Sequence, residues 1–295
     1  MKDFINGYKT YLNDVKKTSA NTTEAYLRDV NQFISYCTEN NIHYISKVNE
    51  IFIRKYIEYL DFLGKSEATK TRIVASLRCY FKYLISIEMV KSNPTTAIKF
   101  KKTEKKLPGV LEAGEIVLLM SQPDTSEYKG IRDKAMLELL YATGIKVSEL
   151  IELNVTDINT QVGILHTRNS KNERIIPIYP SAIKHINDYI TLVRSAIVQD
   201  DTDVLFTNMN GQPMSRQGFW KIIKYYADKA GIDKDITPHT LRHSFAAHLL
   251  ENGAQLKDIK EMLGHSDISS TQVYANLLKS KYINSYAKFH PLAKK

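Results

Sequence analysis

The chain has 295 residues, of which 43% are hydrophobic and 25% charged, and its formal net charge is +9. This composition excludes wholesale disorder, the length allows two domains, and the lack of an apolar run of ~18 residues excludes a membrane-spanning helix. The two cysteines, Cys37 and Cys79, and an N-terminus without a signal-peptide pattern predict reduced thiols in a cytoplasmic protein.

The positive charge is concentrated at the N-terminal end. Residues 1–106 hold 19 Lys+Arg against 11 Asp+Glu, whereas the remaining 189 residues hold 22 against 21. Such a basic segment indicates a polyanionic partner, although a solvated surface explains the charge equally well. No group of Cys, His and carboxylates has metal-ligand spacing, so we expect no metal site.

Residues 1–98 show the apolar spacing of four helices, which predicts a helical bundle. The second helix is predicted to begin at Asn21, with Glu24 completing a capping box. The fourth begins after Ser66 and is interrupted by Ser92-Asn93-Pro94. The outer face of this fourth helix is basic. Its cations are Lys70, Arg72, Arg78 and Lys82.

Residues 99–109 are predicted to form a linker between two domains. Five lysines stand among the eight residues from Lys99 to Lys106, and Leu107-Pro108-Gly109 follows. Repulsion between the lysines favours an extended chain, and Pro-Gly ends regular structure.

Residues 110–295 are predicted to form a second domain, mainly α with a small antiparallel β-sheet. A largely apolar helix over 128–143 ends at Gly144, and Lys146 precedes another helix. Three β-like runs follow, with a polar hairpin tip from Arg168 to Glu173. The runs cover 155–158, 163–167 and 174–178, and further helices are expected at 181–198 and 216–230.

The densest chemistry lies between Thr237 and Asn276. A helix from Pro238 to about Asn252 places three side chains on one face, at spacings i, i+3 and i+4. These are His239, Arg242 and His243. A second short helix ends at Gly264 and turns His265 back, and a third helix carries Tyr274. Arginine matches phosphate oxygens, imidazole donates hydrogen bonds or moves protons, and a tyrosine hydroxyl forms covalent intermediates. Together they predict attack of a phenolate on a phosphodiester.

The order of these motifs resembles that of the tyrosine recombinases, most closely the Xer type. The matching strings are His239-Thr240-Leu241-Arg242-His243, Gly264-His265-Ser266-Asp267, Ser270-Thr271-Gln272-Val273-Tyr274 and, upstream, Tyr141 to Leu150. The resemblance covers nearly the whole chain, and three ordered motifs are a specific signal. It implies a four-helix core-binding domain that clasps DNA, followed by an α+β catalytic domain.

The resemblance also implies a site-specific recombinase, active in DNA recombination and integration without a metal or cofactor. Tyr274 would become joined to a 3′ phosphate and release a 5′ hydroxyl. Arg242 would neutralise the phosphorane, His239 and His265 would donate hydrogen bonds to its oxygens, and His243 would support the site.

DNA binding and assembly follow from the same resemblance. The expected DNA contacts are Lys70, Arg72, Arg78, Lys82, Lys101, Lys102 and His243. Dimers and tetramers are expected to form on double-stranded DNA through the C-terminal tail, in which Tyr282, Tyr286 and Phe289 recur at about helical spacing. Folding of this tail onto its own domain is the alternative.

Two positions depart from the family pattern. Lys146 stands where the family has an arginine, so the charge is kept and the planar fork is lost. A slow recombinase, an introduced substitution and a protein that no longer cuts DNA all fit, and we favour an active protein with a weakened site. At the hairpin, a gapless reading places Asn169 where the family has its general-acid lysine. We assign that role to Lys171, two residues further along the loop.

Two competing functions remain open on the sequence. Lys146 and Asn169 are the features that favour a non-enzymatic DNA-binding relative. A type IB topoisomerase would use the same chemistry without exchanging partners, but the Xer-like two-domain plan and the short basic tail argue against it.

Overall fold

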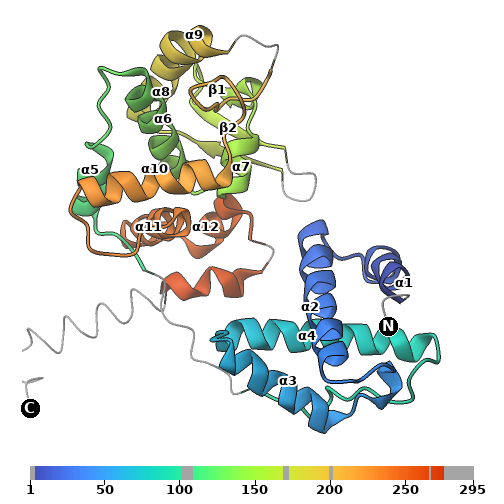
Figure 1. The fold of residues 1–295 in the computed structure, drawn as a ribbon. Helices are drawn as coiled ribbons and strands as arrows, with labels where there is room; N and C mark the ends of the chain where they lie inside the picture. Colours follow the sequence, from blue (N-terminus) through green and yellow to red (C-terminus); the bar gives the residue numbers. More distant parts are fainter. Residues whose placement is uncertain (1–3, 101–108, 169–172, 199–201, 266, 276–295) are drawn as a thin grey trace, which may run out of the picture. The chain divides into compact units, whose positions relative to one another are not determined.

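The computed structural model describes residues 4–100, 109–168, 173–198, 202–265 and 267–275. The chain divides into two compact units, an N-terminal unit, Met1–Lys105, and a C-terminal unit, Lys106–Lys295 (Figure 1). The described part is mostly helical with one three-stranded antiparallel sheet, which confirms the predicted fold class. None of its helices combines the length and apolar character that crossing a membrane requires.

The N-terminal unit is helical, with side-chain caps at three helix starts. Its helices are α1 (Ile5–Thr10), continued by a π-helical turn (Tyr11–Val15), then α2 (Ala20–Glu39), α3 (Glu50–Phe62) and α4 (Glu67–Ser86). Ser19, Asn49 and Ser66 each accept a hydrogen bond from a backbone N–H three residues later. The prediction that the second helix begins at Asn21 was therefore wrong, because Ser19 already caps it.

Helix α4 also ends earlier than predicted, at Ser86. Glu88 adopts a left-handed conformation with φ +59°, and the Met89 N–H donates to the Leu84 carbonyl at 2.9 Å. This reversal satisfies the last turn of the helix before Ser92-Asn93-Pro94 is reached.

Aromatic rings fill the core of the N-terminal unit. Tyr8 meets Tyr80 edge to face with ring centroids 5.0 Å apart, and Phe33 meets Tyr56 at the same separation. All four side chains are fully buried. Among the described residues, the buried hydroxyls of Tyr56 and Tyr80 find no hydrogen-bond partner.

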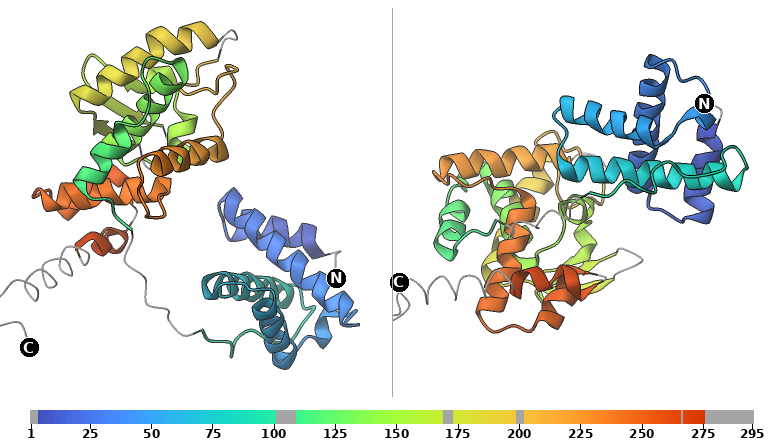
Figure 2. Two further views of the ribbon diagram at one scale, coloured as in Figure 1. Left: turned by 60° about the vertical axis from the view of Figure 1, so that its left-hand side comes forward. Right: turned by 90° about the horizontal axis from the view of Figure 1, so that it is seen from below.

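In the C-terminal unit, helices surround the buried helix α6 (Tyr128–Thr143). Helices α8 and α11 pack directly against it, and Figure 2 shows the same arrangement from two further directions. The other helices are α5 (Ala113–Met120), α7 (Val147–Glu152), α8 (Pro180–Asp188), α9 (Ser195–Ile197), α10 (Arg216–Lys229), α11 (Pro238–Glu251) and α12 (Leu256–Leu263). The helix expected over 181–198 is α8 and α9 joined by a π-helical turn (Tyr189–Arg194).

The small sheet consists of β1 (Ile158–Asn159), β2 (Ile164–Thr167) and β3 (Arg174–Pro177), in that order. Thr167 pairs with Arg174, so the hairpin tip leaves the ladder immediately after β2. The first β-like run was predicted too early. Residues 155–157 form a 3₁₀ turn instead, because the Asp157 carboxylate accepts the Asn154 N–H at 2.8 Å.

Candidate active site

Helix α11 carries three of the predicted site residues and is closely capped at its start. Thr237 accepts the Thr240 N–H at 3.2 Å, and Pro238 occupies the first turn, where no N–H is needed. The helix therefore starts at a fixed residue. Arg242 is buried, His243 half-buried and His239 exposed.

Arg242 connects two loops of the C-terminal unit. Its side chain is part of a residue only 4% exposed, and it donates to the carbonyl of Gly144 and, at 2.7 Å, to that of Leu263. Burial lowers the pKa of Arg242, and the neighbouring Glu149 and Tyr274 oppose this shift. An arginine keeps its proton near neutral pH even so, and a fixed positive charge results.

Gly144 makes this contact possible. It ends α6 with φ +59°, a conformation that side chains with a Cβ rarely adopt. A Cβ here would also collide with the ring of Phe245. Glycine therefore lets the chain turn against α11 and aim its carbonyl at Arg242.

Tyr274 lies beside both Arg242 and His243. It is 1% exposed, and its hydroxyl is 2.9 Å from Nδ1 of His243. Burial raises the pKa of Tyr274, and the positive charge of Arg242 lowers it in part. Burial, followed by the nearby His239 and Arg242, lowers the pKa of His243 to about 4. The imidazole is consequently neutral at pH 7 and has a lone pair for the phenol.

His265 follows the end of α12 and faces the same group of cations. Gly264 ends the helix with φ +64°, and Nδ1 of His265 lies 3.0 Å from the Thr271 hydroxyl. Burial, then the charges of Arg242 and Lys146, lower the pKa of His265 to about 4. The contact with Thr271 ties this histidine to the segment that carries Tyr274, whose residues 272–275 are helical.

Two partly buried residues that the sequence did not single out, Glu149 and Arg174, support the loop of Lys146. Glu149 accepts the Lys146 N–H at 2.8 Å and pairs with Arg174 at 2.9 Å, and Arg174 also donates to the Met262 carbonyl at 2.7 Å. Burial would raise the pKa of Glu149, but Arg174 and the Lys146 N–H lower it overall. The side chain of Lys146 itself is exposed. Glu149 three residues after Lys146 was the available signal, since a carboxylate there caps a helix.

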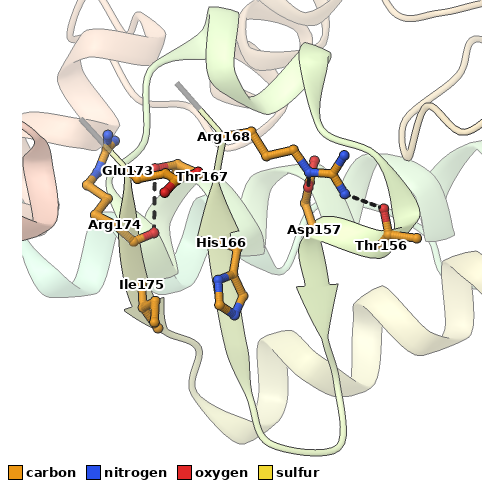
Figure 3. A pocket seen from close by; sticks show the side chains of 8 residues that line it. All are labelled: Thr156, Asp157, His166, Thr167, Arg168, Glu173, Arg174 and Ile175. Carbon is orange, nitrogen blue, oxygen red and sulfur yellow. Dashed lines mark hydrogen bonds and ion pairs between the residues drawn. The ribbon is translucent and has the colours of Figure 1, made fainter. Parts of the chain in front are cut away.

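The hairpin of β2 and β3 borders a cavity of about 780 Å³, shown in Figure 3. Arg168 pairs with Asp157 and donates to the Thr156 hydroxyl at 2.7 Å, while Arg174 lies on the opposite flank of the two strands (Figure 3). The candidate general acid, Lys171, and Asn169 lie outside the described residues.

Two of the expected DNA contacts on α4 already have partners within the N-terminal unit. Lys70 is 4% exposed and pairs with Asp61 and Glu67, so a DNA contact from Lys70 would have to break these pairs. Arg78 donates to the carbonyls of Thr95 and Ile98, which gives it a structural task.

The other expected DNA contacts are either more exposed than Lys70 or lie outside the described residues. Arg72 pairs with the buried Asp29, although its side chain stays 44% exposed, and Lys82 is exposed. His243 bonds with Tyr274 rather than standing open to solvent. Lys101 and Lys102 fall outside the described residues.

The chain matches known protein families and curated proteins over nearly its whole length. The phage integrase family matches residues 109–281, and its N-terminal SAM-like domain matches residues 5–87. Tyrosine recombinase XerD of Staphylococcus epidermidis is 42% identical over 295 residues, 99% of this chain and all of that protein. XerD of Staphylococcus aureus is 41% identical over the same coverage.

Solved structures share the fold at lower identity. XerH site-specific recombinase bound to palindromic difH substrate superposes with TM-score 0.77 at 18% identity, covering 90% of this chain and 79% of that one. A lambda integrase dimer bound to a core site superposes with TM-score 0.71 at 17% identity, covering 93% and 94%.

Proposed function

The chain belongs to the phage integrase family and is a site-specific tyrosine recombinase, and from this premise we propose that Tyr274 is its DNA nucleophile. The phenol oxygen attacks a phosphodiester, remains joined to the 3′ phosphate and releases a 5′ hydroxyl. A second 5′ hydroxyl reverses the step. No external energy source is needed, since the ester is conserved in the protein–DNA bond.

The observation that supports this role is the position of Tyr274 between a fixed cation and a neutral base. Arg242 lowers the pKa of the phenol against the effect of burial, and His243 meets the hydroxyl at 2.9 Å. Preorganised positive charge is the expected means of stabilising a phosphorane. We assign Arg242, with His239, His265 and Lys146, to the phosphate oxygens.

In the described conformation, Tyr274 and Arg242 are not accessible to a substrate. Tyr274 is 1% exposed, and the Arg242 guanidinium donates to two backbone carbonyls. A phosphodiester must therefore reach the site after the segment of Tyr274 moves. Because Thr271 is hydrogen-bonded to His265, a movement of this segment would shift His265 together with Tyr274.

Double-stranded DNA is the proposed partner, in the cytoplasm. On the N-terminal unit, Arg72 and Lys82 are the exposed cations of α4 from the expected set, and Lys101 and Lys102 extend it along the chain. Contacts from such side chains to phosphates determine the affinity for DNA and the position of the protein on the duplex more than they determine which DNA sequence is bound.

We also propose dimers and tetramers on DNA, joined through the C-terminal tail. The C-terminal unit offers an apolar groove of about 270 Å³ between α6, β3, α11 and α12. Its lining includes Ile178, Phe245, Leu249 and Met262. The apolar residues of the tail sequence, Tyr282, Tyr286 and Phe289, have the chemistry to fill such a groove on a neighbouring copy.

A nicked suicide duplex tests the nucleophile. We expect the full-length protein to form a covalent DNA adduct that survives denaturing electrophoresis. Tyr274→Phe should abolish the adduct and keep DNA affinity. Binding without any adduct from the unaltered chain would support the alternative, a DNA-binding relative without cutting activity.

The weakened-site proposal concerns Lys146. Loss of one oriented donor in other enzymes costs about 10²–10³ in rate. Lys146→Arg should therefore accelerate single-turnover cleavage, by as much as about 100-fold, with little change in DNA affinity. An Arg variant that cuts no faster would remove Lys146 from the site.

The general-acid proposal concerns Lys171. Lys171→Ala should slow cleavage and leave DNA affinity nearly intact, and a 5′-bridging phosphorothiolate, whose leaving group needs no proton, should restore the rate. An equal loss of binding and cleavage would contradict this assignment.

A further inference from the structure

A histidine–tyrosine pair at the candidate site suggests a role that none of the matched motifs assigns. His243 lies on α11, and Tyr274 lies 31 residues later in the chain, yet Nδ1 and the hydroxyl are 2.9 Å apart. Their ring centroids are 5.6 Å apart. A hydrogen-bond distance between a base and a hydroxyl nucleophile is the geometry that proton transfer requires.

We infer that His243 is the proton acceptor for the Tyr274 hydroxyl during cleavage, an inference that rests on the proposed nucleophile. The phenol O–H bond breaks and its proton moves to Nδ1. The phenol oxygen bonds to phosphorus, and the bond from phosphorus to the 5′ oxygen breaks. That oxygen takes a proton from the proposed general acid, Lys171. Rejoining runs the same transfers in reverse, so His243 returns the proton.

The other candidate bases of the site are less suitable. Nδ1 of His265 lies at hydrogen-bond distance from Thr271, and His239 is exposed on the first turn of α11. Arg242 and Lys146 are cations, which donate and do not accept. Within the described part of the chain, His243 is the one side chain with a hydrogen bond to the Tyr274 hydroxyl.

Electrostatics keep this acceptor neutral. The titratable and charged groups around His243 are His239 and Arg242 on its own helix, His265 after α12, and Tyr274. Burial, and then the charges of His239 and Arg242, hold the pKa of His243 far below its ordinary value. A neutral imidazole carries one proton, and the inferred transfer uses the tautomer with that proton on Nε2, in which Nδ1 accepts from the phenol.

A second pair on the same helix provides an internal control. Nδ1 of His248 lies 2.8 Å from the Tyr141 hydroxyl. Burial and then Glu138 raise the pKa of Tyr141, whereas Arg242 opposes the rise at Tyr274. The two hydrogen bonds have the same length to within 0.1 Å, but the neighbouring charge disfavours the phenolate at Tyr141 and favours it at Tyr274.

The experiment compares His243→Asn with His248→Asn in single-turnover cleavage of the nicked duplex. Asparagine keeps an acceptor near Nδ1 but is not a base. At pH 7 we expect His243→Asn to lose about 10²–10⁴ in rate, the usual contribution of general base catalysis, and His248→Asn to lose little. Circular dichroism and DNA affinity establish folding, and His243→Gln replaces the Asn variant if that one is unfolded.

The pH profile and a modified nucleophile separate proton transfer from packing. We expect a flat rate from pH 6 to 9 for the unaltered chain and a rate that rises with pH for His243→Asn. Difluorotyrosine at position 274, a more acidic phenol, should restore much of the rate to that variant. Cleavage by His243→Asn at the unaltered rate, or a loss that neither pH nor fluorination changes, would overturn the inference. No adduct from the unaltered chain would instead overturn the proposed nucleophile.

Discussion

The two compact units both bury tyrosines, but they surround them differently. In the N-terminal unit, Tyr56 and Tyr80 lie among other rings, and burial raises the pKa of each phenol. No cation among the described residues opposes this rise. In the C-terminal unit, Tyr274 is equally buried but contacts His243 and lies in the field of Arg242. Burial by itself disfavours the phenolate, and a neighbouring base and cation distinguish the proposed nucleophile, Tyr274, from the core tyrosines.

The same contrast holds for charged side chains. Two cations of α4 pair with carboxylates of their own unit: Lys70 with Asp61 and Glu67, and Arg72 with Asp29. Arg242 instead donates to backbone carbonyls, so no carboxylate cancels its charge through these bonds. Burying a cation without a directly bonded carboxylate costs folding free energy, and binding of an anion at the site can offset that cost.

The largest expected effect comes from making the surroundings of Tyr274 resemble those of Tyr80. Arg242→Met removes the cation and should reduce single-turnover cleavage by about 10³-fold or more, since a charged transition-state contact is lost. The free energy of unfolding should change as well, because two buried carbonyls lose their donors. Arg242→Lys keeps the charge and should retain more activity than Arg242→Met. Equal cleavage rates for Arg242→Met and Arg242→Lys would show that the positive charge at this position does not contribute to cleavage.

An intermediate effect is expected at Gly144, which holds the loop against Arg242. Gly144→Ala combines a strained φ with a collision at Phe245, and we expect a loss of about 2–5 kcal/mol in the free energy of unfolding together with slower cleavage. Gly231→Ala is the matched control, because φ is +63° and nothing lies within 4 Å of the added Cβ. It should cost about 1–2 kcal/mol and leave cleavage unchanged. Urea unfolding and the suicide duplex measure both quantities, and similar losses at the two glycines would contradict the proposed contact.

The smallest effect is expected for the tyrosines of the N-terminal unit. Tyr80→Phe removes a buried hydroxyl that has no hydrogen-bond partner among the described residues, so the free energy of unfolding should change by about 1 kcal/mol or less, in the stabilising direction. Adduct formation should be unaffected. A large loss of cleavage in Tyr80→Phe would break the distinction between the two kinds of buried tyrosine.

Several features of the chain could be predicted from local sequence. Helix positions follow from apolar spacing and from residues such as Ser66 and Pro238, which act on their own turn of the backbone. The ordered strings that end at Tyr274 identified the family before any coordinates, because their residue types and spacing are specific. The start of α2 and the end of α4 were predicted less accurately, since competing caps lie only a few residues apart.

The sequence by itself determined the fold class, the family and the list of reactive side chains. Only the tertiary structure decided which of them meet. The sequence predicts Lys70 as an exposed cation on a helix, but it is paired and buried. Glu149 and Arg174, 25 residues apart, form a partly buried pair that helical periodicity does not predict. The contact between His243 and Tyr274 likewise joins residues 31 positions apart. Periodicity reports only neighbours along one element, whereas these contacts depend on how separate elements pack.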